Sequence, residues 1–267
     1  MRPCVPVLCV ALLAAFGVAS AAAELDDSLH ELVYDAGVTQ LIDTLHGREE
    51  HGAAKEFELY VLAQSWQPEF CHGKEKVYPG CKNPLPYWRE HFTMHGLWPE
   101  RESGAPPGFC GGEPFDADSI EKAIGLDALK QFWPDVKFSD ESPQYPDFWK
   151  HEWTRHGTCS GLSQIEYFSH AVNLIRNGTA ETPTLVQQSV GKSVAIADLR
   201  SAFNSGSSKP AVVLKCMDGG DTLSQVFSCW SKDEGNVPVA RRECPDHVLK
   251  EDTCSRAMIK ILAFPPQ

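Results

Sequence analysis

Residues 148–159 read FWKHEWTRHGTC and bring two histidines, a carboxylate and a guanidinium together beside two tryptophans. At about 100° per residue, an α-helix would place four polar side chains within one arc of about 140°: His151, Glu152, Arg155 and His156. The two tryptophans would form a stripe along the border of that arc, which can be buried against a core. The segment therefore predicts a short helix with one ionic face and one anchored face.

Helix-end signals flank this segment on both sides. Pro146 fits the first turn of a helix, and Asp147 suits the positive end of the helix dipole. Gly157 fits the exit from the helix.

The same segment has two other interpretations, a surface helix and a metal site. A surface helix would carry exposed Glu–Arg pairs, each worth only about 0.2–0.5 kcal/mol. A zinc-protease motif needs its histidines at positions i and i+4, whereas His156 stands at i+5 from His151. No cluster of Asp or Glu supplies further ligands, so we expect neither a metal nor a cofactor.

A second segment, residues 92–100, reads FTMHGLWPE. His95 stands beside Gly96, where the backbone can approach a ligand closely. Trp98 follows, and its flat face could stack on a nucleic-acid base.

Together, the two segments resemble, almost letter for letter, the two active-site segments of the ribonuclease T2 family of secreted acid endoribonucleases. The resemblance begins at the apolar run 57–66, FELYVLAQSW, and extends to 261–265, ILAFP. It implies an α+β fold with a central antiparallel β-sheet and packed helices. It also implies a metal-independent endoribonuclease that cleaves single-stranded RNA through a 2′,3′-cyclic phosphate to 3′-phosphate ends.

The coarse apolar pattern agrees with an α+β fold. Runs at 59–62, 211–214 and 257–264 have the character of buried strands, and 119–132 and 163–176 that of helices. The family fold would then place the active site across the sheet face, between a loop carrying His95 and a helix carrying His156.

The chemistry of RNA cleavage explains the residue types. The 2′-OH is the nucleophile, so the enzyme needs a base, an acid and positive charge. The resemblance implies His156 as the base and His95 as the acid. It further implies that Glu152 and Arg155 support the transition state and that His151 holds a phosphate oxygen. Arg155 stands where the family usually has Lys, which keeps the charge but changes its geometry.

Four residues match base-binding positions of the family. Trp98 corresponds to the contact with the first base, and Gln64 and Phe148 to contacts with the second. Glu100 stands at a base-recognition position where Asp is common, so base preference stays open. Each of these side chains could instead serve packing.

The N-terminal part has the features of a secreted protein. Residues 1–23 combine Arg2, an apolar stretch and a small-residue site at 21–23, which predicts a signal peptide. Residues 24–55 predict a helical extension, with a propeptide or partner-binding arm as alternatives. We expect the catalytic domain in 56–267, with no membrane anchor because no later apolar run approaches 18 residues.

Ten cysteines become eight when Cys4 and Cys9 leave with the signal peptide, an even number that suits an oxidising compartment. The residues alone allow many pairings. The family resemblance implies four disulfides: Cys71 with Cys81, Cys110 with Cys159, Cys216 with Cys254, and Cys229 with Cys244. Asn177 begins an acceptor sequon at an expected helix end, which predicts glycosylation there.

The formal net charge is −12, with 24 Lys and Arg against 36 Asp and Glu. Most nucleic-acid-binding proteins are basic, so long-range attraction for RNA would be poor. Acidic surroundings would lessen the repulsion, which suits secretion or a lysosome- or vacuole-like compartment. We expect a monomer. The competing hypothesis is an inactive family member used as a binding, storage or toxin-like protein, which the presence of both His95 and His156 disfavours.

Overall fold

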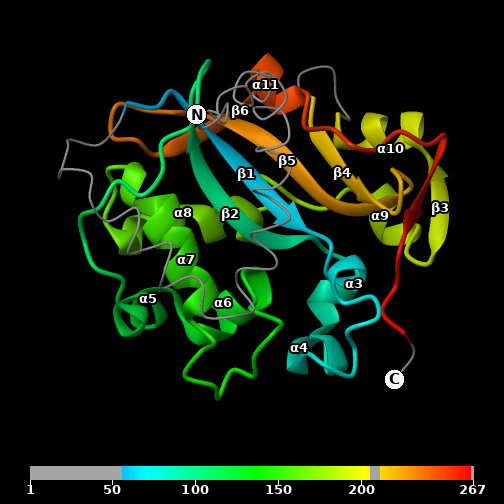
Figure 1. Cartoon of the computed structure of the whole chain (residues 1–267), viewed down its shortest axis with the longest axis horizontal. Coiled ribbons are helices and arrows are strands. Elements are labelled where there is room, and N and C mark those ends of the chain that lie inside the picture. Colours follow the sequence, from blue (N-terminus) through cyan, green and yellow to red (C-terminus); the bar gives the residue numbers. More distant parts are fainter. Residues whose placement is uncertain (1–55, 205–210, 266–267) are drawn as a thin grey trace, which may run out of the picture. The chain divides into compact units, whose positions relative to one another are not determined.

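The computed structural model describes residues 56–204 and 211–265, and within them seven strands form one sheet (Figure 1). The order across the sheet is β2-β1-β5-β7-β3, and β4 and β6 pair with the two halves of β5. The strands are β1 (Leu59–Ser65), β2 (Thr93–Glu100), β3 (Lys192–Ala195), β4 (Val213–Met217), β5 (Thr222–Lys232), β6 (Pro238–Arg242) and β7 (Met258–Ile261). The predicted signal peptide, 1–23, and the predicted extension, 24–55, lie outside the described residues.

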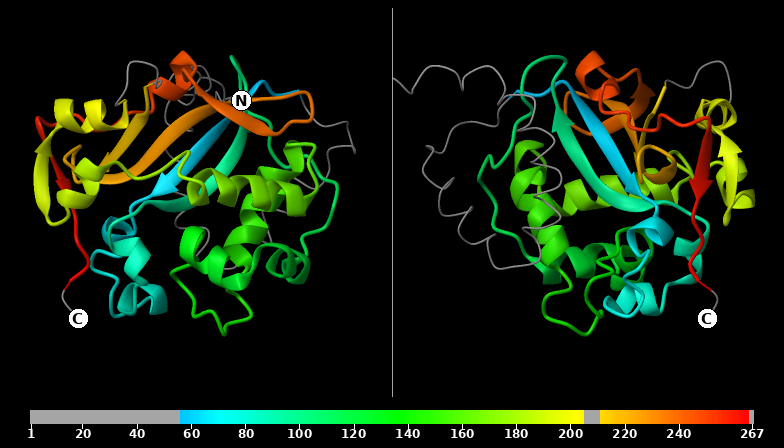
Figure 2. Two further views of the ribbon diagram at one scale, coloured as in Figure 1. Left: turned by 180° about the vertical axis from the view of Figure 1, so that it is seen from behind. Right: turned by 45° about the vertical axis from the view of Figure 1, so that its right-hand side comes forward.

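Helices and short helical turns connect these strands. They are α3 (Gln67–Phe70), α4 (Pro79–Lys82), η1 (Pro86–Arg89), α5 (Ala117–Ile124), α6 (Leu126–Phe132), α7 (Asp147–Arg155), η2 (Gly157–Cys159), α8 (Gln164–Arg176), α9 (Thr184–Gln188), α10 (Ile196–Phe203) and α11 (Asp246–Leu249). Helices α5 to α8 gather beside β1 and β2, whereas α9 and α10 lie with β3 at the other end of the sheet (Figures 1 and 2).

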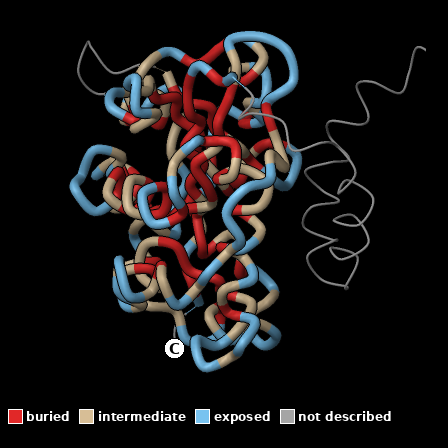
Figure 3. The backbone as a smooth tube through the Cα atoms, turned by 90° about the vertical axis from the view of Figure 1, so that its left-hand side faces the viewer, coloured by how far each residue is buried: buried red, intermediate tan, exposed pale blue. Residues whose placement is uncertain are grey.

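The central strands are buried on both faces. In β1, Tyr60 and Leu62 join the core formed with helices α5 to α8, while Leu59, Val61 and Ala63 face a second core that includes Val248 of α11. Covering both faces explains why β1 reads as a continuous apolar run rather than an alternating one. The buried backbone accordingly runs through the middle of the molecule, with exposed segments around it (Figure 3).

Helix α7 forms where its sequence predicts it. Trp149 and Trp153 are buried, and each indole N–H donates a hydrogen bond of 2.8 Å to a backbone carbonyl, of Trp133 and Glu113 respectively. A buried indole needs such a partner. The aromatic face therefore fixes the rotation of the helix and turns its ionic face toward β2.

Four disulfides join the pairs that the family resemblance implies: Cys71 with Cys81, Cys110 with Cys159, Cys216 with Cys254, and Cys229 with Cys244. The second of these attaches the turn that follows α7 to the loop carrying Cys110. Because it closes a long segment, it restricts the unfolded chain strongly in the loop-entropy account of disulfide stabilisation.

The structure corrects several sequence-based boundaries. The helix expected over 119–132 is two helices, because Gly125 between them has φ +93°, a conformation that glycine adopts without strain. His95 lies in strand β2 rather than in a loop. The sheet is antiparallel except for one parallel pairing of β5 with β7, at Thr222 and Lys260.

Helix α8 ends close to the expected position. Ser163 and Glu166 form a capping box at its start, and Asn177 is its exposed C-cap residue. Gly178 follows with φ +71°, which suits a helix exit. Glycosylation of Asn177 stays a prediction that this exposed position permits.

Candidate active site

A β-bulge in β2 directs His95 toward the site. The register pairs Ala63 with Gly96 and Gln64 with Met94, so His95 is an extra residue in β2. Bulges re-aim side chains and are common beside active sites. Here, the Nδ1 atom of His95 lies 2.9 Å from the Oε1 atom of Gln225 on β5.

Gly96 leaves space for the central contact of the site. The indole N–H of Trp98 on β2 donates a hydrogen bond of 2.9 Å to Glu152 Oε2 on α7. A Cβ atom at Gly96 would clash with both of these groups. The glycine is therefore required because a helix side chain and a strand side chain meet directly above its Cα atom.

Glu152 is a buried carboxyl group, with only 1% of its surface exposed. Its Oε1 atom lies 3.9 Å from His95 Nε2. Burial raises the pKa of Glu152 to about 6, against the opposing effects of His95, the Trp98 hydrogen bond and Arg155. This carboxyl group therefore changes its charge in mildly acid solution, rather than near pH 4.5.

Trp98 brings the two principal histidines to one place. His156, the C-cap residue of α7, stacks on the indole with ring centroids 5.3 Å apart. His95 meets the same indole edge-on at 5.2 Å. Phe148, from the first turn of α7, lies 5.7 Å from the His95 ring. The two imidazoles come from different elements and share one aromatic neighbour.

The C-terminal end of α7 is held by the loop that carries Cys110. The backbone N–H of Phe109 donates to the Arg155 carbonyl at 2.9 Å, and the Arg155 guanidinium lies 5.6 Å from the Phe109 ring centroid. Phe109 has φ +51°, an uncommon conformation for a residue with a side chain. Thr158 Oγ1 also accepts a hydrogen bond from the Cys110 N–H.

His151 is half-buried and precedes Glu152 on the same helix.

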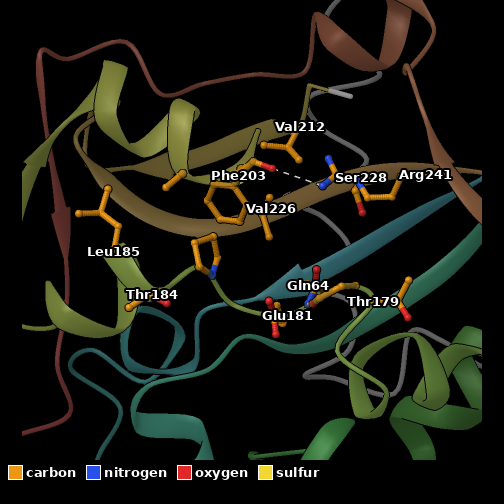
Figure 4. A pocket seen from close by; sticks show the side chains of 13 residues that line it. Gln64, Thr179, Glu181, Thr184, Leu185, Phe203, Val212, Val226, Ser228 and Arg241 are labelled. Atoms are coloured by element: carbon orange, nitrogen blue, oxygen red, sulfur yellow. Dashed lines mark hydrogen bonds between the residues drawn. The ribbon is translucent and has the colours of Figure 1, made fainter. Parts of the chain in front are cut away.

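Gln64 is the predicted site residue that the structure does not bring to His95. It pairs with Val226 of β5, whereas Gln225, the next residue along, faces His95. Gln64 Nε2 donates to the Ala180 carbonyl, and the side chain lines a separate pocket of about 280 Å³ beside Arg241 (Figure 4). Because neighbouring strand positions face opposite ways, Gln64 lies on the wrong face of the sheet to contact a base stacked near His95.

Glu100 lies two residues beyond Trp98 at the end of β2, and it is buried. Its Oε1 atom is 3.4 Å from His247 Nε2 on α11 and accepts the Arg101 N–H at 2.8 Å. Burial raises the pKa of Glu100, and the Arg101 and His247 contacts partly offset this effect. Positions 98 and 100 share one face of the strand, so a group stacked on Trp98 would have Glu100 along the same face.

Comparison with known proteins assigns the chain to a family. Residues 57–244 match the model of the ribonuclease T2 family. The chain belongs to the ribonuclease T2 family. It is therefore an endoribonuclease, and reaction through a 2′,3′-cyclic phosphate is characteristic of the family. The α+β fold predicted from the sequence is confirmed.

Individual relatives agree with this assignment. The chain is 29% identical to ribonuclease 1 of Arabidopsis thaliana, over 72% of this chain and 82% of the relative. It is 30% identical to ribonuclease DdI of Dictyostelium discoideum, over 75% and 82% respectively. The solved structure of ribonuclease MC1 from bitter gourd seeds is similar with a TM-score of 0.56 at 26% identity, covering 76% of this chain and all of that one.

Sequence reasoning missed three residues that contact the candidate site: Gln225, His247 and Phe109. Gln225 and His247 lie 130 and 147 positions from the strand residues that they contact, His95 and Glu100. A single sequence carries no local signal for such contacts. Phe109 beside Cys110 offered a hint, because the implied disulfide to Cys159 places it near the end of α7.

Metal-binding clusters and membrane-spanning helices are both absent from the described residues. In that part of the chain, no group of three or more His, Cys, Asp or Glu side chains is arranged to hold a metal ion. No helix among the same residues is long and apolar enough to cross a membrane.

The space above Gly96 predicts that no side chain larger than hydrogen is tolerated at this position. Gly96→Ala should lower kcat by about 100-fold, because displacing Trp98 or Glu152 by even 1 Å disturbs the geometry of the reacting groups. Gly235→Ala is the matched control, since its Cβ atom would lie 3.4 Å from its nearest neighbour, Asp233 Oδ1. Steady-state kinetics, with thermal unfolding to verify the fold, would measure the effect. Full activity in a folded Gly96→Ala variant would contradict this account of the gap.

The raised pKa of Glu152 predicts a pH-dependent stability. The folded state holds this proton more tightly than the unfolded state, so the ionised carboxyl group costs stability as pH rises from 4.5 through about 6. Relative to wild type, Glu152→Gln should gain about 2 kcal/mol in unfolding free energy between pH 4 and pH 7.5. Urea unfolding at both pH values measures this, with exposed Glu234→Gln as the control. A gain that is equal at both pH values would contradict the burial effect.

Proposed function

We propose that His95 and His156 act as the acid and base of RNA cleavage in this chain, around the Trp98–Glu152 contact. The observation that carries the proposal is that both imidazoles contact the indole of Trp98, from β2 and from the end of α7. A 2′-OH nucleophile needs a base on one side of the phosphate and an acid on the other. The two imidazoles that contact Trp98 can supply this base and this acid.

The first step is transphosphorylation. His156, in its neutral form, takes the proton of the 2′-OH, whose oxygen attacks the adjacent phosphorus. The bond from phosphorus to the 5′-oxygen breaks, and protonated His95 gives its proton to that oxygen. The product is a 2′,3′-cyclic phosphate. Water then opens this ring with the two histidines in exchanged roles, leaving a 3′-phosphate.

Glu152 and its neighbours would stabilise the charge that develops on the phosphate. A carboxyl group with a pKa of about 6 is partly protonated in mildly acid solution, so it can donate a hydrogen bond to a phosphate oxygen and repels the phosphate less. Arg155 supplies a permanent positive charge at the end of α7. His151 is proposed to contact a phosphate oxygen from the preceding turn of the helix.

Base binding would use the aromatic surface around the histidines. A base can stack on Trp98, and a second base can contact Phe148 beside His95. Such stacking needs bases that are free of a duplex, which favours single-stranded RNA as substrate. Glu100 is proposed to recognise the first base, with His247 as its partner.

The biological setting follows from other features. The eight cysteines of residues 56–267 form four disulfides, which favours an oxidising compartment. We propose entry into the secretory route through residues 1–23, with an extracellular or a lysosome- or vacuole-like destination. Curated relatives include both extracellular and intracellular ribonucleases. We further propose that the protein acts as a monomer.

The histidine roles can be tested one at a time. His95→Ala and His156→Ala should each lower kcat by at least about 100-fold, the usual scale of acid–base help. The double variant should be little worse than the worse single variant, because the pair acts as one unit. Exposed His72→Ala is the matched control. Near-normal activity in either folded single variant would remove that histidine from the mechanism.

The choice of nucleophile separates this reaction from water-activating nucleases and from a non-catalytic binding role. In an RNA oligomer with one 2′-deoxy sugar, the linkage 3′ of that sugar should resist cleavage, because its nucleophile is absent. EDTA should leave cleavage of the all-ribose oligomer unchanged, and mass spectrometry should find cyclic phosphate ends. Cleavage at the deoxy linkage would indicate an activated water, and intact all-ribose RNA would indicate a binding protein.

A further inference from the structure

His95 has a partner from a distant strand. The Oε1 atom of Gln225 lies 2.9 Å from its Nδ1 atom, across 130 residues of sequence. Gln225 stands directly opposite Ser65 of β1, so its strand position is fixed within the sheet. On its other side, the β4–β5 register pairs Lys215 with Gln225 and Cys216 with Leu223, which leaves Ser224 as a bulge. Both members of the contact thus lie at or beside a bulge.

The chemistry of this contact decides where the imidazole carries its protons. A carbonyl oxygen only accepts hydrogen bonds, so Nδ1 must carry a proton to bond with Gln225. In neutral imidazole, Nε2 is then the unprotonated nitrogen; in imidazolium, Nε2 also carries a proton. The nitrogen that gains and loses the proton is therefore Nε2, which lies on the side of Glu152.

We propose that Gln225 is a positioning residue that fixes the tautomer and the ring orientation of His95. The inference rests on the proposed role of His95 as the acid. An acid must present Nε2–H to the leaving 5′-oxygen and must present Nε2 as an acceptor after the transfer. An imidazole without this partner can carry its neutral proton on Nε2 or rotate away from the phosphate. In neither state is Nε2 of neutral His95 placed to accept a proton when water opens the cyclic phosphate.

A pH experiment on His95 also responds to the other charged groups around this residue. Glu152 of α7 lies 3.9 Å from Nε2. Lys215 of β4, opposite Gln225, has its ammonium group 3.7 Å from Glu251. His156 contacts the same indole of Trp98 as His95 does. Gln225 itself is uncharged, so it orients the ring without adding a charge.

The first test reads the tautomer directly. Nitrogen-15 NMR of the full chain with labelled histidine should show neutral His95 with its proton on Nδ1. Gln225→Leu should shift the neutral ring toward the Nε2–H form. This readout does not depend on catalysis, so it stands even if His95→Ala retained activity and the proposed function failed. A neutral wild-type ring protonated on Nε2 would overturn the proposal.

The second test uses kinetics. Gln225→Leu should lower kcat by about 10- to 100-fold, the usual effect of removing a group that orients a functional histidine, with little change in KM. Gln225→Glu should retain much more activity than Gln225→Leu, because its carboxylate also accepts from Nδ1–H. Its negative charge favours the imidazolium, so the alkaline limb of the pH–rate profile should move up by about one unit.

A matched control exists in the same molecule. The side-chain nitrogen of Gln187 lies 3.2 Å from Nδ1 of His91, another Gln–His contact, formed between α9 and the residue two positions before β2. Gln187→Leu and Gln187→Glu should leave kcat and the pH profile unchanged. A folded Gln225→Leu variant with wild-type kcat, or a Gln225→Glu variant that is as inactive as Gln225→Leu with an unmoved alkaline limb, would overturn the proposal. If Gln225→Leu does not fold, the Gln225→Glu profile and the wild-type NMR spectrum decide.

Discussion

The hydrogen bond from Trp98 to Glu152 is the contact on which the site depends. It joins the strand that carries His95 to the helix that ends in His156, and it passes through the space left by Gly96. The indole of Trp98 therefore makes three contacts. Its N–H donates to the carboxyl group of Glu152, and its ring contacts the imidazoles of His95 and His156. The two imidazoles are thus held near each other by contact with one rigid aromatic side chain.

Burying Glu152 opposes stability, and the surrounding packing offsets that cost. A carboxyl group that is 1% exposed loses most of its hydration, and one hydrogen bond from an indole replaces only part of it. Trp149 and Trp153 bury large apolar surfaces on the same helix, and the Cys110–Cys159 bridge fixes the turn that follows it. The protein thereby retains a carboxyl group whose proton affinity suits mildly acid conditions.

The sequence predicted those helices and strands whose signals lie within one short segment. Helix α7 was predictable because its aromatic stripe, proline entry and glycine exit all lie within one short segment. Strand β2 was not, because the His95 bulge and Pro99 interrupt the alternation that identifies a strand. The assignment of Gln64 shows a different limit. Side chains of a strand alternate between faces, so a shift of one position moves a residue to the opposite side of the sheet. The partnership of Gln225 with His95 depends on sheet pairing alone and has no local signature.

The acidic net charge can be reconciled with an RNA substrate by the short range of electrostatic forces in salt. At physiological ionic strength, charges are screened over about 8 Å, so a distant carboxylate on the surface acts weakly on a phosphate in the site. His95, Arg155 and His156, which can carry positive charge, lie around the Trp98–Glu152 contact, and burial raises the pKa of Glu152 itself to about 6. Lowering the pH through this range adds a proton to Glu152 and removes its negative charge. The local charge of the site therefore becomes more favourable to phosphate as the solution becomes mildly acid.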